Sequence, residues 1–154
     1  MAEWTSAARQ IVQPGEAIVF TDNPIPCIKG YIRSREDSGY FNLNGNIPTR
    51  NTRRCCCMYN NAIQYHADFG ANIAVPEGET VGEISVAYQI GNATLQGTTM
   101  IVTPAAVEEF FNISRSTSIA VFKGCCQNFA IINTSDIPIA VVNANVEINP
   151  VLEE

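Results

Sequence analysis

Cysteine is the residue type in this chain that offers the most chemistry. Six are present, five of them adjacent to another cysteine: Cys27, Cys55, Cys56, Cys57, Cys125 and Cys126. A structural zinc site usually spaces its ligands as Cys-X₂₋₄-Cys, and neither the triplet nor the pair does so. We therefore expect no metal site, and disulfide bonds are the favoured interpretation. A metal shared between subunits and six reduced, partly buried thiols stay open as alternatives.

A disulfide between the 55–57 triplet and the 125–126 pair would close a long loop. In the chain-entropy account such a bridge adds about 4–5 kcal/mol, which is comparable with the net stability of a small domain. Adjacent side chains on a strand point to opposite faces, so Cys125 and Cys126 should not both enter one core. Cys27 could then form a disulfide with the remaining partner or with another subunit.

Nucleophilic catalysis would need the single histidine, His66, beside a cysteine. His66 stands between Tyr65 and Ala67 in an alternating segment, which is typical of a structural or surface histidine. The acidic pairs at 36–37 and 108–109 consist of neighbours, whose side chains diverge on a strand or helix. We therefore expect no catalytic residues, no bound cofactor and no enzymatic activity.

Three arginines, Arg50, Arg53 and Arg54, stand just before the cysteine triplet. The net charge of −6 repels phosphates, so nucleic acid is not an expected partner. We interpret these arginines as part of a solvated loop, with contact to another protein as the functional alternative. Trp4, the only tryptophan, lies near the N-terminus, where an exposed aromatic side chain usually docks on its own domain or on a neighbour.

Short apolar runs with a period of two follow one another, separated by turn residues. The clearest are residues 84–90, 118–122, 128–133 and 139–148. This period directs one row of side chains inward and the other outward, and several such strands at short spacing predict a sandwich or barrel. Residues 30–33 and 39–43 flank a charged loop and predict a hairpin. Thr103 followed by Pro104 predicts a short turn of helix over 103–109.

The bulk composition predicts one domain. A chain of 154 residues with 46% hydrophobic content can build its own core, and we place the domain at residues 14–154, preceded by an N-terminal arm of residues 1–13. Only 16% of the residues are charged, which fits a protein that covers its surface with copies of itself. No run approaches the ~18 apolar residues of a membrane span, and the N-terminus lacks the pattern of a secretory signal. We therefore expect no membrane partner and synthesis in a cytoplasm without export by that route.

The order of several segments resembles a known family. The segments are 65–73, 84–90 with the turn Gly91-Asn92, 97–100, 119–122 with Lys123-Gly124, 129–135 and 143–148. They resemble the tumour necrosis factor/complement-head jelly roll, as in small phage-encoded virion proteins and the tips of bacterial collagen-like fibres. The resemblance covers about residues 57–151. The chain departs from the family where Cys125-Cys126, not an aspartate, follows Gly124, and it lacks the collagen-like Gly-X-Y stalk.

The resemblance implies an all-β fold, a two-sheet antiparallel jelly roll that assembles as a homotrimer around a three-fold axis. In such trimers aromatic side chains usually pack between subunits, and the candidates here are Tyr65, Phe69, Tyr88, Phe110, Phe111 and Phe129. The residues expected to contact a capsid are Trp4, Arg50, Arg53 and Arg54.

From this resemblance we expect a structural virion protein of a tailed phage, a trimeric capsid decoration or head-fibre component that stabilises the capsid exterior. Its partners would be its own copies and the major capsid protein or other virion proteins. The alternative is a carbohydrate- or receptor-binding adhesin head on a phage, bacterial or spore surface, for which a surface glycan would be the ligand.

Overall fold

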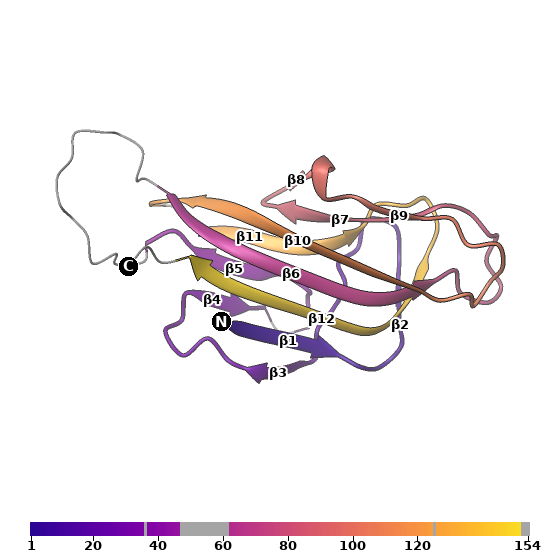
Figure 1. The fold of residues 1–154 in the computed structure, drawn as a ribbon, viewed down its shortest axis with the longest axis horizontal. Helices are drawn as coiled ribbons and strands as arrows, with labels where there is room; N and C mark the ends of the chain where they lie inside the picture. The colour runs from indigo at the N-terminus through magenta and orange to yellow at the C-terminus, as the bar shows by residue number, and fades with distance from the viewer. Residues whose placement is uncertain (36, 47–61, 125, 152–154) are drawn as a thin grey trace.

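Two antiparallel sheets packed face to face form the fold (Figure 1). The computed structural model describes residues 1–35, 37–46, 62–124 and 126–151. The first sheet has the order β10 (Phe111–Phe122), β6 (Ala62–Ala74), β12 (Ile139–Val151), β1 (Ala2–Ser6) and β3 (Asp22–Ile25), with β2 (Gln10–Val12) also paired to β12. The second sheet has the order β4 (Ile32–Ser34), β5 (Phe41–Asn44), β11 (Cys126–Asn133), β7 (Ile84–Ile90) and β8 (Ala93–Thr94), with β9 (Met100–Val102) also paired to β7. This arrangement confirms the predicted all-β, two-sheet fold.

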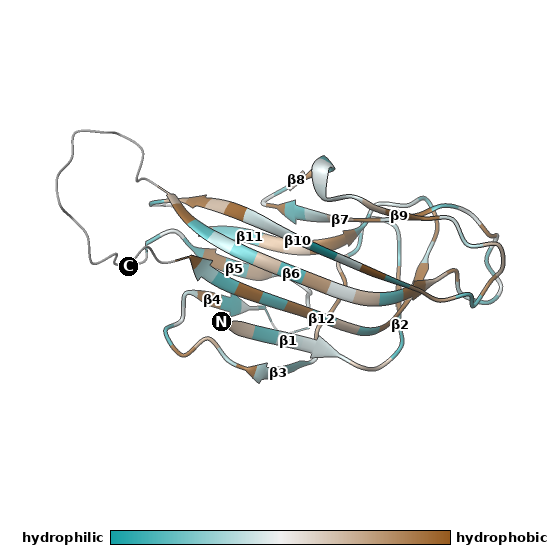
Figure 2. Ribbon diagram, viewed as in Figure 1, coloured by the Kyte–Doolittle hydropathy of each residue, from teal (hydrophilic) through white to brown (hydrophobic). Residues whose placement is uncertain are grey.

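Alternation of apolar and polar side chains along the long strands explains why the sheets pack on each other. In β6 the buried positions recur at every second residue from Ile63 to Ile73, and the residues between them face outward. Figure 2 shows the same alternation of hydrophobic and hydrophilic residues along β6, β10 and β12. Each sheet therefore contributes one apolar face to a shared core, and its other face is left for contacts outside that core.

A chain of aromatic rings runs through the core. Trp4 lies against Phe41 with ring centroids 4.8 Å apart, and Phe41 lies 6.2 Å from Phe129. Tyr88 meets Phe129 edge-on, with centroids 5.2 Å apart and an interplanar angle of 85°. These tilted and edge-on contacts are the preferred arrangements of aromatic pairs, and they link β1 of the first sheet to β5, β11 and β7 of the second.

Two tyrosine hydroxyls form hydrogen bonds between the sheets, one donated from each sheet to the other. Tyr65 projects from β6, and its hydroxyl donates to the Asn44 carbonyl at 2.6 Å and lies 3.2 Å from the Tyr31 carbonyl. Tyr88 projects from β7, and its hydroxyl donates to the Arg115 carbonyl on β10. Burial raises the pKa of both phenols above its ordinary value, so each stays protonated and keeps donating.

The N-terminal residues belong to the sandwich, which corrects the prediction of a separate arm at residues 1–13. Ala2 to Ser6 pair along β12, and β2 pairs with the start of the same strand. Trp4 is only 3% exposed, so it is a core residue and not a capsid contact. Alternation in this short strand directs Trp4 and Ala2 inward, beside residues of β12 that are more than 140 positions further along the chain.

Residues 103–109 form turns instead of the predicted helix. Glu109 Oε2 accepts the backbone N–H groups of Ala105 at 2.8 Å and Ala106 at 3.3 Å, and Glu108 has a positive φ of 58°. The positive φ of Glu108 lies outside the helical region, so the predicted helix does not form here. In the described part of the chain the helical segment is a 3₁₀ turn at Gln96–Thr98. No helix of the described residues is long and apolar enough to span a membrane.

Candidate functional site: the outer faces of the two sheets

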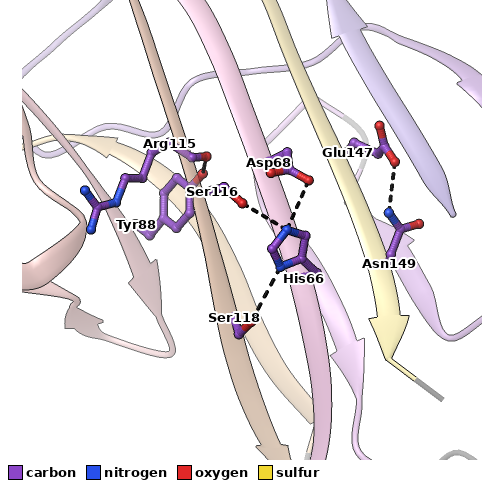
Figure 3. Close-up of polar contacts among 8 residues, drawn as sticks. All are labelled: His66, Asp68, Tyr88, Arg115, Ser116, Ser118, Glu147 and Asn149. Carbon is purple, nitrogen blue, oxygen red and sulfur yellow. Dashed lines mark hydrogen bonds and ion pairs between the residues drawn. The ribbon is translucent and has the colours of Figure 1, made fainter. Parts of the chain in front are cut away.

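His66 is the centre of a polar cluster on the outer face of the first sheet (Figure 3). Its Nε2 atom lies 2.9 Å from Ser116 Oγ and 3.5 Å from Asp68 Oδ2, and its Nδ1 atom lies 3.5 Å from Ser118 Oγ. A Ser-His-Asp triad needs the carboxylate on one ring nitrogen and the nucleophile on the other. Here Ser116 and Asp68 approach the same nitrogen. Asp68 and Ser118 do lie on opposite nitrogens, but each is 3.5 Å away, which is longer than the hydrogen bonds of about 2.6–3.2 Å that join a nucleophile, a base and its carboxylate. The His66 side chain is also 42% exposed. The cluster is therefore an exposed polar network with one short contact, from His66 to Ser116, as expected for a surface histidine.

Three carboxylates lie side by side across the same face. Glu3 on β1 is opposite Glu147 on β12, and Glu147 is opposite Asp68 on β6. Glu147 accepts a hydrogen bond from Asn149 Nδ2 at 2.9 Å, but among the described residues no arginine or lysine forms an ion pair with any of the three. Like charges on neighbouring strands repel each other. Within the described ranges no group of histidine, cysteine and acidic side chains is arranged to hold a metal ion.

One end of this face is apolar. Phe122, the last residue of β10, is 62% exposed, and Val151, the last residue of β12, is 48% exposed. The register places Phe122 opposite Ala62 and places Gln64 between Ala120 and Val151. The outer face of the first sheet thus combines an acidic, hydroxyl-rich centre with an apolar end formed by Phe122 and Val151.

Four of the six aromatic residues predicted at a trimer interface lie in the core of the single chain, which corrects that assignment. Tyr65, Tyr88 and Phe129 are fully buried and Phe69 is 3% exposed, all between the two sheets. Phe110 is 41% exposed and Phe111 is half-buried, both where β10 begins. The reason is strand parity. On β6 the odd-numbered residues face the second sheet, so the polar even-numbered residues face outward.

The exposed pair Phe122 and Val151 was missed at the level of sequence, although a signal for it exists. Val121 and Ile148 are buried apolar residues in strands that alternate. Alternation from these buried positions puts Phe122 and Val151 on the opposite, outer face. Exposed large apolar side chains there indicate an interaction site.

The cysteines are only partly described. Cys27 is half-buried and Cys126 is exposed, and among the described residues neither is joined to another cysteine by a disulfide. Both lie at the end of the sandwich that holds the Tyr65 hydroxyl. Cys55, Cys56, Cys57 and Cys125 lie outside the described residues, as do Arg50, Arg53 and Arg54.

A shallow groove of about 270 Å³ lies on the outer face of the second sheet. Its walls are polar side chains from β4, β5, β11 and the β4–β5 turn: Arg33, Ser34, Arg35, Tyr40, Asn42 and Asn128. The predicted hairpin is confirmed here, because β4 and β5 pair antiparallel across the turn that carries Arg35. The groove therefore combines two guanidinium groups, two amides and one phenol.

The backbone arranges these side chains as a two-row array. Arg33 is opposite Asn42, and Asn42 is opposite Asn128, to which its Nδ2 atom donates at 3.4 Å. In the next row the Arg35 N–H donates to the Tyr40 carbonyl at 2.8 Å. Arg35 directly follows the last residue of β4, and both arginines line the same groove.

Comparisons with known proteins address the fold. No protein-family profile and no curated protein matches the sequence. Among solved structures, the globular domain of the zebrafish complement 1qA protein is similar, with a TM-score of 0.59 and 12% identity over 95% of this chain and 94% of that one. At this identity the likeness shows the fold alone, and the fold is the jelly roll predicted from the segment order.

Proposed function

We propose that this chain is a non-enzymatic head domain that assembles as a homotrimer through the outer face of the first sheet. The observation that carries the proposal is the exposed pair Phe122 and Val151 at one end of that face. Full burial of such a side chain contributes about 1.5–3 kcal/mol. Three copies that meet at this end would cover six of these side chains, and the resemblance to trimeric jelly-roll heads supplies the stoichiometry.

The acidic row positions the contact on this face. Glu3, Glu147 and Asp68 of one copy would repel the same residues of another if the centres of the faces met directly. This repulsion favours a contact at the apolar end, with the acidic row at its solvated margin. Added salt screens the repulsion between copies, so the trimer should become tighter as ionic strength rises.

Paired serine substitutions test the assembly. In Phe122→Ser/Val151→Ser, size-exclusion chromatography with light scattering should show single chains of 16.8 kDa where the unmodified chain gives a trimer. The matched control is Ile101→Ser, which removes an apolar residue that is 59% exposed on the second sheet. A monomeric unmodified chain, or a double variant that stays trimeric, would contradict the proposal.

In its biological setting we propose that the trimer is a structural virion protein of a tailed phage that decorates the capsid or forms a head fibre. Support comes from the segment resemblance to phage-encoded virion proteins and from the low charge of the chain, which suits a permanent assembly. Phage particles purified on a density gradient, from a culture that carries the gene, should contain this chain in a fixed ratio to the major capsid protein. Particles that lack the chain would refute the virion role and leave the trimer untouched.

The groove on the second sheet favours a second candidate function, recognition of a receptor or carbohydrate. It lies on the sheet opposite the proposed trimer contact, so assembly would leave it open. A head that assembles through one sheet and presents a groove on the other suits an adhesin as well as a capsid component. If the intact trimer binds a defined ligand, the adhesin is favoured over the capsid component.

A further inference from the structure

His66 lies between the apolar end and the acidic row of the outer face of the first sheet (Figure 3). Two residues before it on β6, Gln64 is opposite Val151, and two residues after it, Asp68 is opposite Glu147. Successive residues on one face of a strand are about 6.7 Å apart. The imidazole is therefore one such step from the apolar end and one from the acidic row, at the margin of the trimer contact proposed above.

The strands on one side of His66 bring it no free positive charge. On its own strand the Asp68 Oδ2 atom lies 3.5 Å from Nε2. On β10 the facing groups are the hydroxyls of Ser116 and Ser118, which are uncharged. Arg115, the charged residue of β10, donates instead to a carbonyl of the 3₁₀ turn at 2.7 Å. Because a hydroxyl can both donate and accept, the two serines can bond the ring in its neutral and in its protonated form.

The strands on the other side add further acidic groups. Asn149 on β12 is opposite His66, and Glu147 lies two residues before it. Glu3 on β1 is opposite Glu147. The charged groups that face the imidazole among the described residues are thus carboxylates, and a proton on His66 would place a positive charge beside the acidic row.

One proton changes the repulsion between copies substantially. The row of Glu3, Glu147 and Asp68 gives this face of each copy a charge of about −3, and a protonated His66 lowers it to about −2. Repulsion between two such faces scales with the product of their charges, so it falls from about nine to about four in the same units. Histidine is the side chain that ordinarily changes charge between pH 5 and 8, and this chain has a single one.

We infer that His66 makes the assembly pH-sensitive, with the trimer tightening when its imidazole is protonated. The inference rests on the trimer proposed above and assigns its regulation to one side chain. By linkage, an assembly that is favoured by a bound proton also holds that proton more tightly than the separate chains do. The trimer is therefore tighter at about pH 5.5 than at pH 7.

Sedimentation equilibrium of the full-length chain at pH 7 and at about pH 5.5 tests the inference. Both samples are kept at the same low ionic strength, where the repulsion is least screened. The concentration at which half of the chains are trimeric should be at least fivefold lower at the acidic pH. A trimer that is equally tight, or looser, at the acidic pH would overturn the inference and leave the proposed assembly standing. A chain that is monomeric at both pH values would refute the assembly itself.

Three variants separate the charge of His66 from its other contacts. His66→Lys carries a permanent charge and should be as tight at pH 7 as the unmodified chain is at the acidic pH. His66→Gln is neutral and should stay as loose at both pH values as the unmodified chain is at pH 7. His66→Gln/Asn112→His moves the histidine to the other end of the same face, where Asn112 is exposed opposite Asn72, and should also lose the response. A pH response that persists in either glutamine variant would refute the assignment.

Discussion

Replacement of Asn133 by alanine tests how the sandwich is joined at the end of β11. This side chain is fully buried. Its Nδ2 atom donates to the Val12 carbonyl at 3.0 Å and to the Ile137 carbonyl at 2.9 Å. Its Oδ1 atom accepts the Ser135 backbone N–H at 3.0 Å and also the Ser135 hydroxyl. One amide thus connects β2, the β11–β12 turn and β11 itself.

The magnitude follows from the partners that Asn133→Ala leaves behind. Two backbone carbonyls and one backbone N–H lose their hydrogen-bond partner inside the protein. A net loss of about 1 kcal/mol for each gives about 3 kcal/mol of lost unfolding free energy. With a urea m-value of about 2 kcal/mol/M, the denaturation midpoint should fall by about 1.5 M at 25 °C.

The assay is urea denaturation followed by tryptophan fluorescence at one fixed protein concentration, because assembly makes stability depend on concentration. Asn112→Ala is the matched control, since Asn112 is exposed and donates only to Asn72 Oδ1, at 3.1 Å. The control should lose less than about 0.5 kcal/mol. If Asn133→Ala unfolds at the same midpoint as Asn112→Ala, the buried amide does not join these segments as argued.

Two further changes test the turns. Gly39→Ala should lower the free energy of unfolding by at least about 2 kcal/mol, because φ is +70° and the new Cβ would lie 2.3 Å from the Ile18 carbonyl oxygen. Gly15→Ala, at a positive φ but with open space around it, should lower it by about 1 kcal/mol in the same urea assay. The hydrogen bonds from Arg9 hold the pKa of Glu108 at about 2, below the ordinary value of 4.5. The pair therefore stabilises the fold above pH 4.5, and this contribution is lost as pH falls from 4.5 towards 2. The melting temperature of Glu108→Gln should lie below that of the unmodified chain at pH 6, and the gap should close near pH 2; a gap that does not depend on pH would contradict the assignment.

The strands were predictable because their signals are local. Residues 84–90 alternate and end at a glycine turn, and the structure places β7 over the same residues. The hairpin of β4 and β5 was likewise visible, since both strands and their turn lie within one short segment. The predicted short helix was wrong. Thr103 and Pro104 are favourable at a helix start, but Glu108 takes a positive φ, and the backbone N–H groups of Ala105 and Ala106 donate to the Glu109 carboxylate in a turn.

Pairings between distant segments were not predictable from one sequence. Trp4 lies opposite Val146 on β12, and Asn128 joins Arg33 and Asn42 only because β11 lies beside β5. The same limit explains the wrong interface assignment. Alternation shows that Tyr65 shares a face with its odd-numbered neighbours, but it does not show whether that face meets the second sheet or another subunit.

The central claim is that copies of this chain meet at the end of the first sheet where Phe122 is exposed. Hydroxyl-radical footprinting at two protein concentrations, one at which the trimer forms and one at which it dissociates, tests it most directly. Phe110, which is 41% exposed in the single chain, is the internal reference. Oxidation of Phe122 should slow severalfold in the assembled sample, whereas oxidation of Phe110 should be unchanged. Equal oxidation of Phe122 at both concentrations would contradict it.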